Sequence, residues 1–148
     1  MPHAALVGKL NGRLRASSQP ACFVCGQDNP QGLQLRFETG EGGERIACWS
    51  PGANWEGFRG IVHGGIVSTV LDEAMSKAVA STGEEALTAE LKVRFRRHVA
   101  SGSVYSIRGW VVERTKRLTR TEASLTAADG TECAHAWGRF LTLAPGRG

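Results

Sequence analysis

Hydrophobic residues recur at intervals of three and four positions in the middle of the chain, between Ile66 and Val79. The apolar positions are Ile66, Val67, Val70, Leu71, Ala74, Met75, Ala78 and Val79. This spacing places them on one face of an α-helix, because a helix completes one turn every 3.6 residues. The pattern predicts one long amphipathic helix that begins near Gly64 and ends at Gly83.

The segments on either side of this helix show apolar and polar residues in alternation, which is typical of half-buried strands. Two such segments precede the helix, at residues 33–37 and 45–49, and glycines 40, 42 and 43 mark a hairpin between them. Four follow it, at residues 91–95, 105–111, 123–127 and 134–140. Gly102 and the pair Asp129-Gly130 mark turns between the later strands.

The predicted order is therefore two strands, one long helix and four strands. A single amphipathic helix has one apolar stripe to bury, and an antiparallel sheet wrapped around it would do so. A chain of 148 residues is long enough for one such α+β domain. We expect this domain at residues 21–148, after an N-terminal extension at residues 1–20. Leu6, Leu10 and Leu14 predict a short packing helix in the extension rather than a targeting segment.

Composition excludes two broad classes of protein. The chain is 41% hydrophobic and 22% charged, which is not the balance of a disordered segment. Its longest uncharged central stretch falls far short of the ~20 apolar residues of a membrane-spanning helix. We therefore expect no membrane span and a cytoplasmic location.

Positive charge is concentrated late in the chain, although the net charge is only +4. Residues 92–120 hold nine Lys and Arg residues and one acidic residue, Glu113. Such a surplus favours an anionic partner such as phosphate, although a solvated sheet face would explain it equally well. No nucleic-acid-binding motif accompanies these charges, so nucleic acid is not the expected partner.

Four cysteines are present, Cys22, Cys25, Cys48 and Cys133. The Cys22-x-x-Cys25 spacing is that of half a zinc site, but no second Cys or His pair completes it. Zinc binding, thiol redox chemistry and plain buried thiols all stay open as interpretations of this pair.

Two features beside the predicted helix could carry chemistry. His63-Gly64-Gly65 comes directly before it, and glycines there let a ligand approach the free backbone amides at a helix start. The alternative is a simple tight turn. Asp72 and Glu73 follow on the polar helix face, about 100° apart around the axis, so they cannot both point at one site.

These segments together resemble a known family. Cys22-Phe23-Val24-Cys25-Gly26, Asn29-Pro30-Gln31-Gly32-Leu33, Gly60-Ile61-Val62-His63-Gly64-Gly65, Leu71-Asp72-Glu73-Ala74 and Thr88 to Phe95 are similar to the PaaI-like acyl-CoA thioesterases. That group has the hotdog fold and belongs to the 4-hydroxybenzoyl-CoA thioesterase superfamily. The resemblance covers roughly residues 20–143, and the spacing from His-Gly-Gly to the acid is its most specific part.

The resemblance implies roles for the matched residues. The Gly64 amide would bind the thioester carbonyl, and Asp72 would act as general base or nucleophile. Thr88 would orient Asp72 or water, and His63 would fix the glycine turn or hydrogen-bond near the thioester. Glu73 is a possible second acid. Candidates for binding coenzyme A are Gly65, Arg94, Arg96, Lys116 and Arg117.

Some relatives carry an asparagine six residues before the histidine, where this chain has Gly57. Any help from that asparagine in holding water is missing here. Thioester hydrolysis needs no metal, and coenzyme A would enter only as part of the substrate. We expect no cofactor.

A six-stranded hotdog leaves open sheet edges, and relatives pair them into dimers or dimers of dimers. Gly64 of one subunit would then face Asp72 and Thr88 of its partner.

Two alternatives to hydrolysis remain. One is a non-catalytic acyl-CoA-binding protein that serves as sensor or carrier. The other is a hydratase, although the Asp-x-x-x-x-His spacing of that class is missing.

Overall fold

The computed structural model describes residues 19–143, so the helix expected in residues 6–14 lies outside the described part. Eight elements follow a loop that occupies residues 19–37. They are β1 (Glu38–Thr39), β2 (Arg45–Trp49), the short 3₁₀ helix η1 (Ala53–Trp55), α2 (Gly64–Ala80), β3 (Ala86–Phe95), β4 (Tyr105–Arg114) and β5 (Leu118–Ala127), with β6 (Glu132–Thr142) as the last strand.

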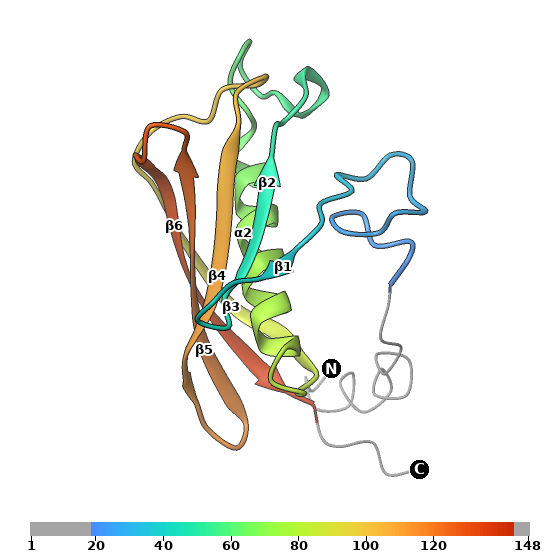
Figure 1. Cartoon of the computed structure of the whole chain (residues 1–148), viewed down its shortest axis with the longest axis vertical. Helices are drawn as coiled ribbons and strands as arrows, with labels where there is room; N and C mark the ends of the chain where they lie inside the picture. The colour runs from blue at the N-terminus through green and yellow to red at the C-terminus, as the bar shows by residue number, and fades with distance from the viewer. Residues whose placement is uncertain (1–18, 144–148) are drawn as a thin grey trace.

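The strands form one antiparallel sheet in the order β1-β2-β4-β5-β6-β3. The long strands β4, β5 and β6 lie in the centre, while β1 and β3 are the two edges. Figure 1 shows α2 lying along one face of this sheet. The structure confirms the expected six-stranded antiparallel sheet wrapped around one long helix.

The helix packs closely against β4, because Gly109 has no side chain. A Cβ atom at Gly109 would lie 2.4 Å from the backbone carbonyl carbon and oxygen of Ala74. The apolar stripe predicted from the sequence is the buried face of α2, with Val67, Val70, Leu71, Ala74, Met75, Ala78 and Val79 inside. It meets a core that the sheet supplies through Ile107, Leu125 and Phe140.

The helix stops where the sequence predicts. Gly83 follows its last turn with φ +87°, a backbone conformation that favours glycine. Gly130 has φ +89° in the turn between β5 and β6, as the Asp129-Gly130 pair suggests. No helix in residues 19–143 is both long enough and apolar enough to cross a membrane.

The strand expected at residues 33–37 is wrong: the structure has loop there, and β1 is limited to Glu38–Thr39. Gln34 has φ 52°, which breaks an extended chain. The amides of Leu33 and Leu35 donate to carbonyls of the preceding loop, at Phe23 and Val24. The apolar residues of this segment belong to a loop that packs against the core, and Leu35 is its buried member. Their alternation therefore does not indicate a strand.

Candidate active site

His63 caps the N-terminus of α2 and leaves one backbone amide free. Its Nδ1 atom accepts a hydrogen bond from the Gly65 amide at 2.9 Å. The Ile66 and Val67 amides donate to the His63 carbonyl. Within residues 19–143, the Gly64 amide has no hydrogen-bond acceptor. A free amide at the positive end of a helix can donate to a carbonyl oxygen that gains negative charge.

The aromatic ring of Phe95 lies close to Gly64. A Cβ atom at Gly64 would lie 3.6 Å from Phe95 Cζ, an ordinary contact distance. Phe95 is the last residue of β3 and is 53% exposed. The space around the Gly64 amide is therefore bounded on one side by an exposed apolar ring.

Asp72 and Thr88 form the second group of the site. Thr88 Oγ1 donates to Asp72 Oδ1 at 2.7 Å, which links α2 to the edge strand β3. A β-bulge between Thr88 and Glu90 shifts the register of β3 against β6 at this point. Burial raises the pKa of the Asp72 carboxyl, while the hydrogen bond from Thr88 acts in the opposite direction.

A cleft of about 260 Å³ adjoins Asp72. Polar residues of α2 and apolar residues of other segments line it: Ser68, Thr69, Asp72 and Glu73 on the helix, Cys22, Phe23 and Val24 on the loop, and Leu91 on β3. Phe23 and Leu91 are exposed hydrophobic side chains. The cleft thus combines a carboxylate on one wall with apolar side chains on the others.

Gly64 and Asp72 of one protomer are too far apart to act on the same atom. Eight residues separate them, which corresponds to about 12 Å along a helix axis. One protomer therefore presents a free amide at one place and a carboxylate at another. A complete site needs both groups within reach of one thioester.

Glu73 faces different partners from Asp72. Cys22 Sγ lies 3.9 Å from Glu73 Oε2, and Cys25 lies in the same cluster. Burial raises the pKa of the Glu73 carboxyl, and the nearby Lys77 ammonium opposes that rise. The two adjacent carboxylates have different hydrogen-bond partners, although both line the same cleft.

More than half of the cations in the basic segment have an acidic partner in the fold. Five of the nine cations in residues 92–120 form ion pairs: Arg96 with Glu132, Arg97 with Asp129, Arg108 with Glu44, Arg114 with Glu84, and Arg120 with Glu113. Four of the five acids lie outside the segment. The excess of positive charge around the folded segment is therefore smaller than the excess counted along residues 92–120.

The candidate phosphate-binding residues fall into two groups. Arg94 pairs in register with His135 of β6, whereas Leu118, which follows Lys116 and Arg117, pairs with Leu141. Six residues of β6 separate these positions, or about 20 Å. Arg94 and Arg96 lie at the Phe95 end of β3, while Lys116 and Arg117 lie at the opposite end of the sheet. One protomer does not bring all four together.

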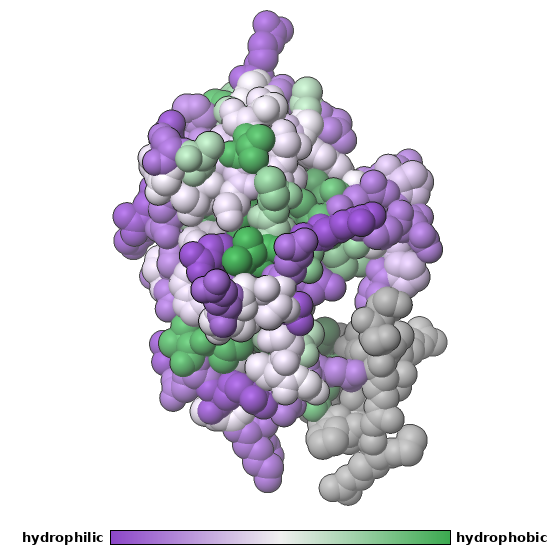
Figure 2. Space-filling view, viewed as in Figure 1, coloured by the Kyte–Doolittle hydropathy of each residue, from purple (hydrophilic) through white to green (hydrophobic). Residues whose placement is uncertain are grey.

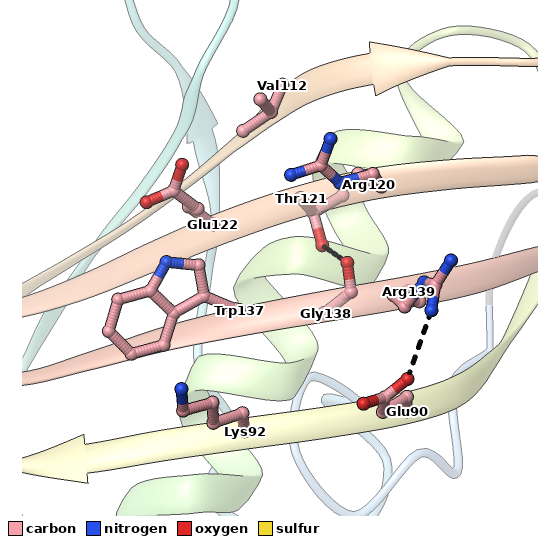
Figure 3. A pocket seen from close by; sticks show the side chains of 9 residues that line it. All are labelled: Glu90, Lys92, Val112, Arg120, Thr121, Glu122, Trp137, Gly138 and Arg139. Carbon is pink, nitrogen blue, oxygen red and sulfur yellow. Dashed lines mark hydrogen bonds and ion pairs between the residues drawn. The ribbon is translucent and has the colours of Figure 1, made fainter.

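The outer face of the sheet carries a separate charged pocket, which Figure 3 shows. Lys92 Nζ lies 5.3 Å from the ring centroid of Trp137, and Arg139 forms an ion pair with Glu90 at 3.5 Å. Lys92 therefore has an aromatic partner and Arg139 an acidic one. On the face seen in Figure 2, hydrophobic residues form separate patches among hydrophilic side chains.

Gly57, the position at which some relatives have asparagine, lies against His63. A Cβ atom there would be 3.3 Å from His63 Cδ2, which is a tight contact. The Gly57 amide donates to the Ile61 carbonyl, and the His63 amide donates to the Trp55 carbonyl. The absence of a side chain at Gly57 therefore leaves room for the histidine that caps α2.

One long helix packed on a six-stranded antiparallel sheet is the hotdog fold, and comparisons with known proteins agree with it. Residues 59–134 match the family model of the Thioesterase superfamily. The chain belongs to the Thioesterase superfamily.

Individual proteins are similar to the chain in sequence or in fold. The chain is 27% identical over 130 residues to the acyl-coenzyme A thioesterase THEM4 of Bos taurus, covering 86% of this chain and 54% of that protein. The structure of the E. coli PaaI protein, from the phenylacetic acid degradation operon, matches with a TM-score of 0.74 at 15% identity, over 95% of this chain and 96% of that one. A Streptococcus mutans protein bound to acetyl-CoA matches with a TM-score of 0.69 at 20% identity, over 73% and 87% of the two chains. The chain spans about half the length of the curated relatives it matches.

Several residues of the site were not singled out from the sequence. Phe95 and Leu91 look like ordinary alternating strand positions, and Phe23 looks like part of a turn-rich loop. All three side chains are exposed in the structure. For Phe95 and Leu91, this exposure follows from the position of β3 at the edge of the sheet. Sequence periodicity alone does not reveal which strand lies at an edge.

Proposed function

We propose that the protein hydrolyses the thioester bond of an acyl-CoA to a free acid and coenzyme A. The observations that carry this proposal are a free Gly64 amide at the start of α2 and an Asp72 carboxylate that Thr88 holds beside an apolar cleft. The name of the THEM4 relative and the acetyl-CoA bound to the Streptococcus mutans protein support the substrate class.

The Gly64 amide would donate to the thioester carbonyl oxygen as that oxygen becomes negative. Asp72 would remove a proton from water, so that hydroxide attacks the carbonyl carbon, or would itself attack that carbon. Collapse of the tetrahedral intermediate then breaks the carbon–sulfur bond and releases the coenzyme A thiolate. When Asp72 is the nucleophile, this step leaves a mixed anhydride between the acyl group and Asp72. Water then hydrolyses the anhydride to the free acid and restores the Asp72 carboxylate. These steps use no cofactor and no metal ion, because the amide supplies the electrophilic group.

The acyl group would lie in the cleft beside Asp72, against Phe23 and Leu91. Arg94 and Arg96 lie at the Phe95 end of β3 and are the candidates for the phosphates of coenzyme A near Gly64. Lys116 and Arg117 would serve only if a partner subunit brought them close. Gly65 would contribute through the backbone that His63 orients. We place the protein in the cytoplasm, where a reducing environment keeps free thiols such as Cys48 reduced.

We further propose that two protomers pair through β3, whose outer edge has no strand beside it in the sheet. If two copies overlap along the whole strand, the two-fold axis passes between Glu90 and Leu91. Thr88 then lies opposite Val93 of the other copy, two positions from Phe95. Because Phe95 contacts Gly64, each carboxylate would approach the free amide of the other protomer.

Complementation between two inactive variants tests both proposals. Gly64→Pro removes the amide hydrogen, yet proline is tolerated at the first position of a helix. The preceding His63 has φ −56° and ψ 134°, a conformation compatible with a following proline. We expect kcat to fall about 10²–10³-fold in Gly64→Pro, and about 10²-fold or more in Asp72→Asn.

Refolding the two variants together at equal amounts should restore roughly one quarter of wild-type activity. Half of the dimers would then be mixed, and each mixed dimer holds one intact site. Gly64→Ala keeps the amide and serves as the folding control. No recovery on mixing would reject the shared site. A wild-type protein that binds acyl-CoA but releases no thiol from any aliphatic or aromatic ester would favour the non-catalytic binder.

A further inference from the structure

A second cluster of reactive side chains lies next to the proposed active site and is not used by it. Cys22 and Cys25 come from the loop before β1, and Glu73 comes from α2. Their ligand atoms all lie within 4.8 Å of one another, and all three side chains are partly buried. Glu73 is 51 residues from Cys22 along the chain, so the fold alone brings them together.

The loop holds the two cysteines in a tight turn. The Gly26 amide donates to the Cys22 carbonyl at 2.7 Å, which closes the turn around both residues. A Cβ atom at Gly26 would lie 2.4 Å from the Cys22 backbone nitrogen and oxygen. Glycine is therefore the residue that lets the chain close so tightly. The turn directs two thiols to the same carboxylate.

The spacing of the cluster suits a tetrahedral metal ion. Zinc binds thiolate sulfur at about 2.3 Å and carboxylate oxygen at about 2.0–2.2 Å, so the ligand atoms lie roughly 3.5–3.8 Å apart. The Cys22 Sγ to Glu73 Oε2 distance is 3.9 Å. Small side-chain rotations would bring the remaining atoms from within 4.8 Å to the same separation.

The charges of the cluster also suit a divalent cation. The Glu73 carboxylate lies beside both thiols, and the three side chains are partly buried. Lys77 lines the same cavity as the cluster. A divalent ion would displace the thiol protons, and together with Lys77 it would neutralise two thiolates and one carboxylate.

We propose that Cys22, Cys25 and Glu73 bind a thiophilic divalent metal ion of the zinc type. Three protein ligands leave a fourth position, which would face the neighbouring cavity of about 570 Å³. Lys77, Glu84 and Glu85 line that cavity with the three ligands. The proposal rests on the cluster itself and does not depend on the thioesterase activity.

Such an ion would fasten the loop to α2 one residue away from Asp72. Cys22 lines both the Asp72 cleft and the larger cavity, so the ion would fix the wall between them. The role would be structural, since Glu73 and Asp72 face different partners. Metal removal should therefore lower thermal stability before it changes the chemistry at Asp72.

Titration of the reduced, metal-free protein with Co²⁺ tests the site. We expect one equivalent to bind, with sulfur-to-cobalt charge-transfer absorption in the near ultraviolet and the visible bands of tetrahedral cobalt. Zn²⁺ should displace it. At a zinc concentration about 100 times Kd, the Tm should rise roughly 5–10 °C.

Variants locate the ion. Cys22→Ser, Cys25→Ser and Glu73→Gln should each weaken cobalt binding at least about 100-fold, since even indirect partners of a metal cost 10–100-fold. Cys48→Ser, which alters an exposed cysteine outside the cluster, should bind as the wild type does. Far-ultraviolet circular dichroism checks that each variant is folded.

Three results would overturn the proposal. They are no charge-transfer band in the reduced wild type, equal loss of binding in Cys48→Ser, and a Cys22–Cys25 disulfide that forms in air at the same rate with and without zinc. Because the readouts are absorption, Tm and thiol oxidation, an inactive thioesterase would leave this test unaffected.

Discussion

Thr88 tunes the proton affinity of Asp72, and this can be measured. Burial raises the pKa of Asp72, and the Thr88 hydroxyl stabilises the ionised form and lowers it. Asp72 must be ionised to act as base or nucleophile, so activity falls as pH drops through its pKa. Removing the hydroxyl in Thr88→Val should raise that pKa and move the acidic limb of the kcat/KM profile to higher pH.

Thr88→Ser keeps a hydroxyl at the same position and should retain the wild-type profile. An unchanged acidic limb in Thr88→Val, or an equal shift in Thr88→Ser, would show that the hydrogen bond does not set the pKa. The profile of Glu73→Gln separates the neighbouring carboxylate. Its acidic limb should stay near that of the wild type, because Glu73 contacts Cys22 rather than Thr88.

Individual residues were predictable from sequence to different degrees. The free amide at Gly64 follows from its place at the start of the only strongly periodic segment. Asp72 was singled out from its neighbour only through the family resemblance, since both acids lie on the polar helix face. The partnership of Cys22 with Glu73 was not predictable, because no local rule joins residues 51 positions apart.

At the scale of elements, the contact between α2 and β4 depends on Gly109. In Gly109→Ala the new methyl group would meet the backbone of Ala74 at 2.4 Å, and backbone cannot move aside as a side chain does. We expect the free energy of unfolding, measured by urea denaturation, to fall by about 1–3 kcal/mol.

Gly138→Ala provides the matched comparison on β6. Its nearest atoms belong to side chains, Thr121 Oγ1 at 2.8 Å and Met75 Sδ at 2.9 Å, and methionine adapts readily. The loss of stability should therefore be smaller than in Gly109→Ala. An equal or larger loss at Gly138 would contradict the view that backbone contact limits the approach of helix to sheet.

Elements with strong periodicity were predicted well, and those without it were not. The helix and the four later strands follow from spacings of three to four and of two. Residues 33–37 alternate like a strand, yet Gln34 has a positive φ and the neighbouring amides bind a loop. The charge of the basic segment was also predicted incompletely from the sequence. Its acidic partners are distant in the sequence and lie beside it only in the folded sheet.

At the scale of the whole molecule, β3 is the edge on which the proposed dimer depends. Leu91 is 37% exposed on that strand and would lie beside the two-fold axis. Leu91→Glu would place the carboxylates of both copies close together, where like charges cost several kcal/mol. We expect a monomer by light scattering after size-exclusion chromatography. Thioesterase activity should also be lost, both because the site is shared and because Leu91 lines the acyl cleft.

Val104→Glu is the control, since Val104 is 52% exposed but lies outside every strand. Val104→Glu should retain the oligomeric mass of the wild type by light scattering and its thioesterase activity. Full activity in a monomeric Leu91→Glu protein would mean that one protomer suffices. A wild-type protein that is monomeric at micromolar concentration would remove the dimer from the proposal.

The loop at residues 22–24 forms one wall of the Asp72 cleft, while the sheet and α2 hold the groups proposed for chemistry. Backbone hydrogen bonds from the Leu33 and Leu35 amides attach this wall to the later part of the same loop rather than to a strand. Loops accept insertions and substitutions more readily than the scaffold does. Under the proposed function, changes in this loop would alter selectivity for the size of the acyl chain and leave the groups proposed to cleave the thioester in place.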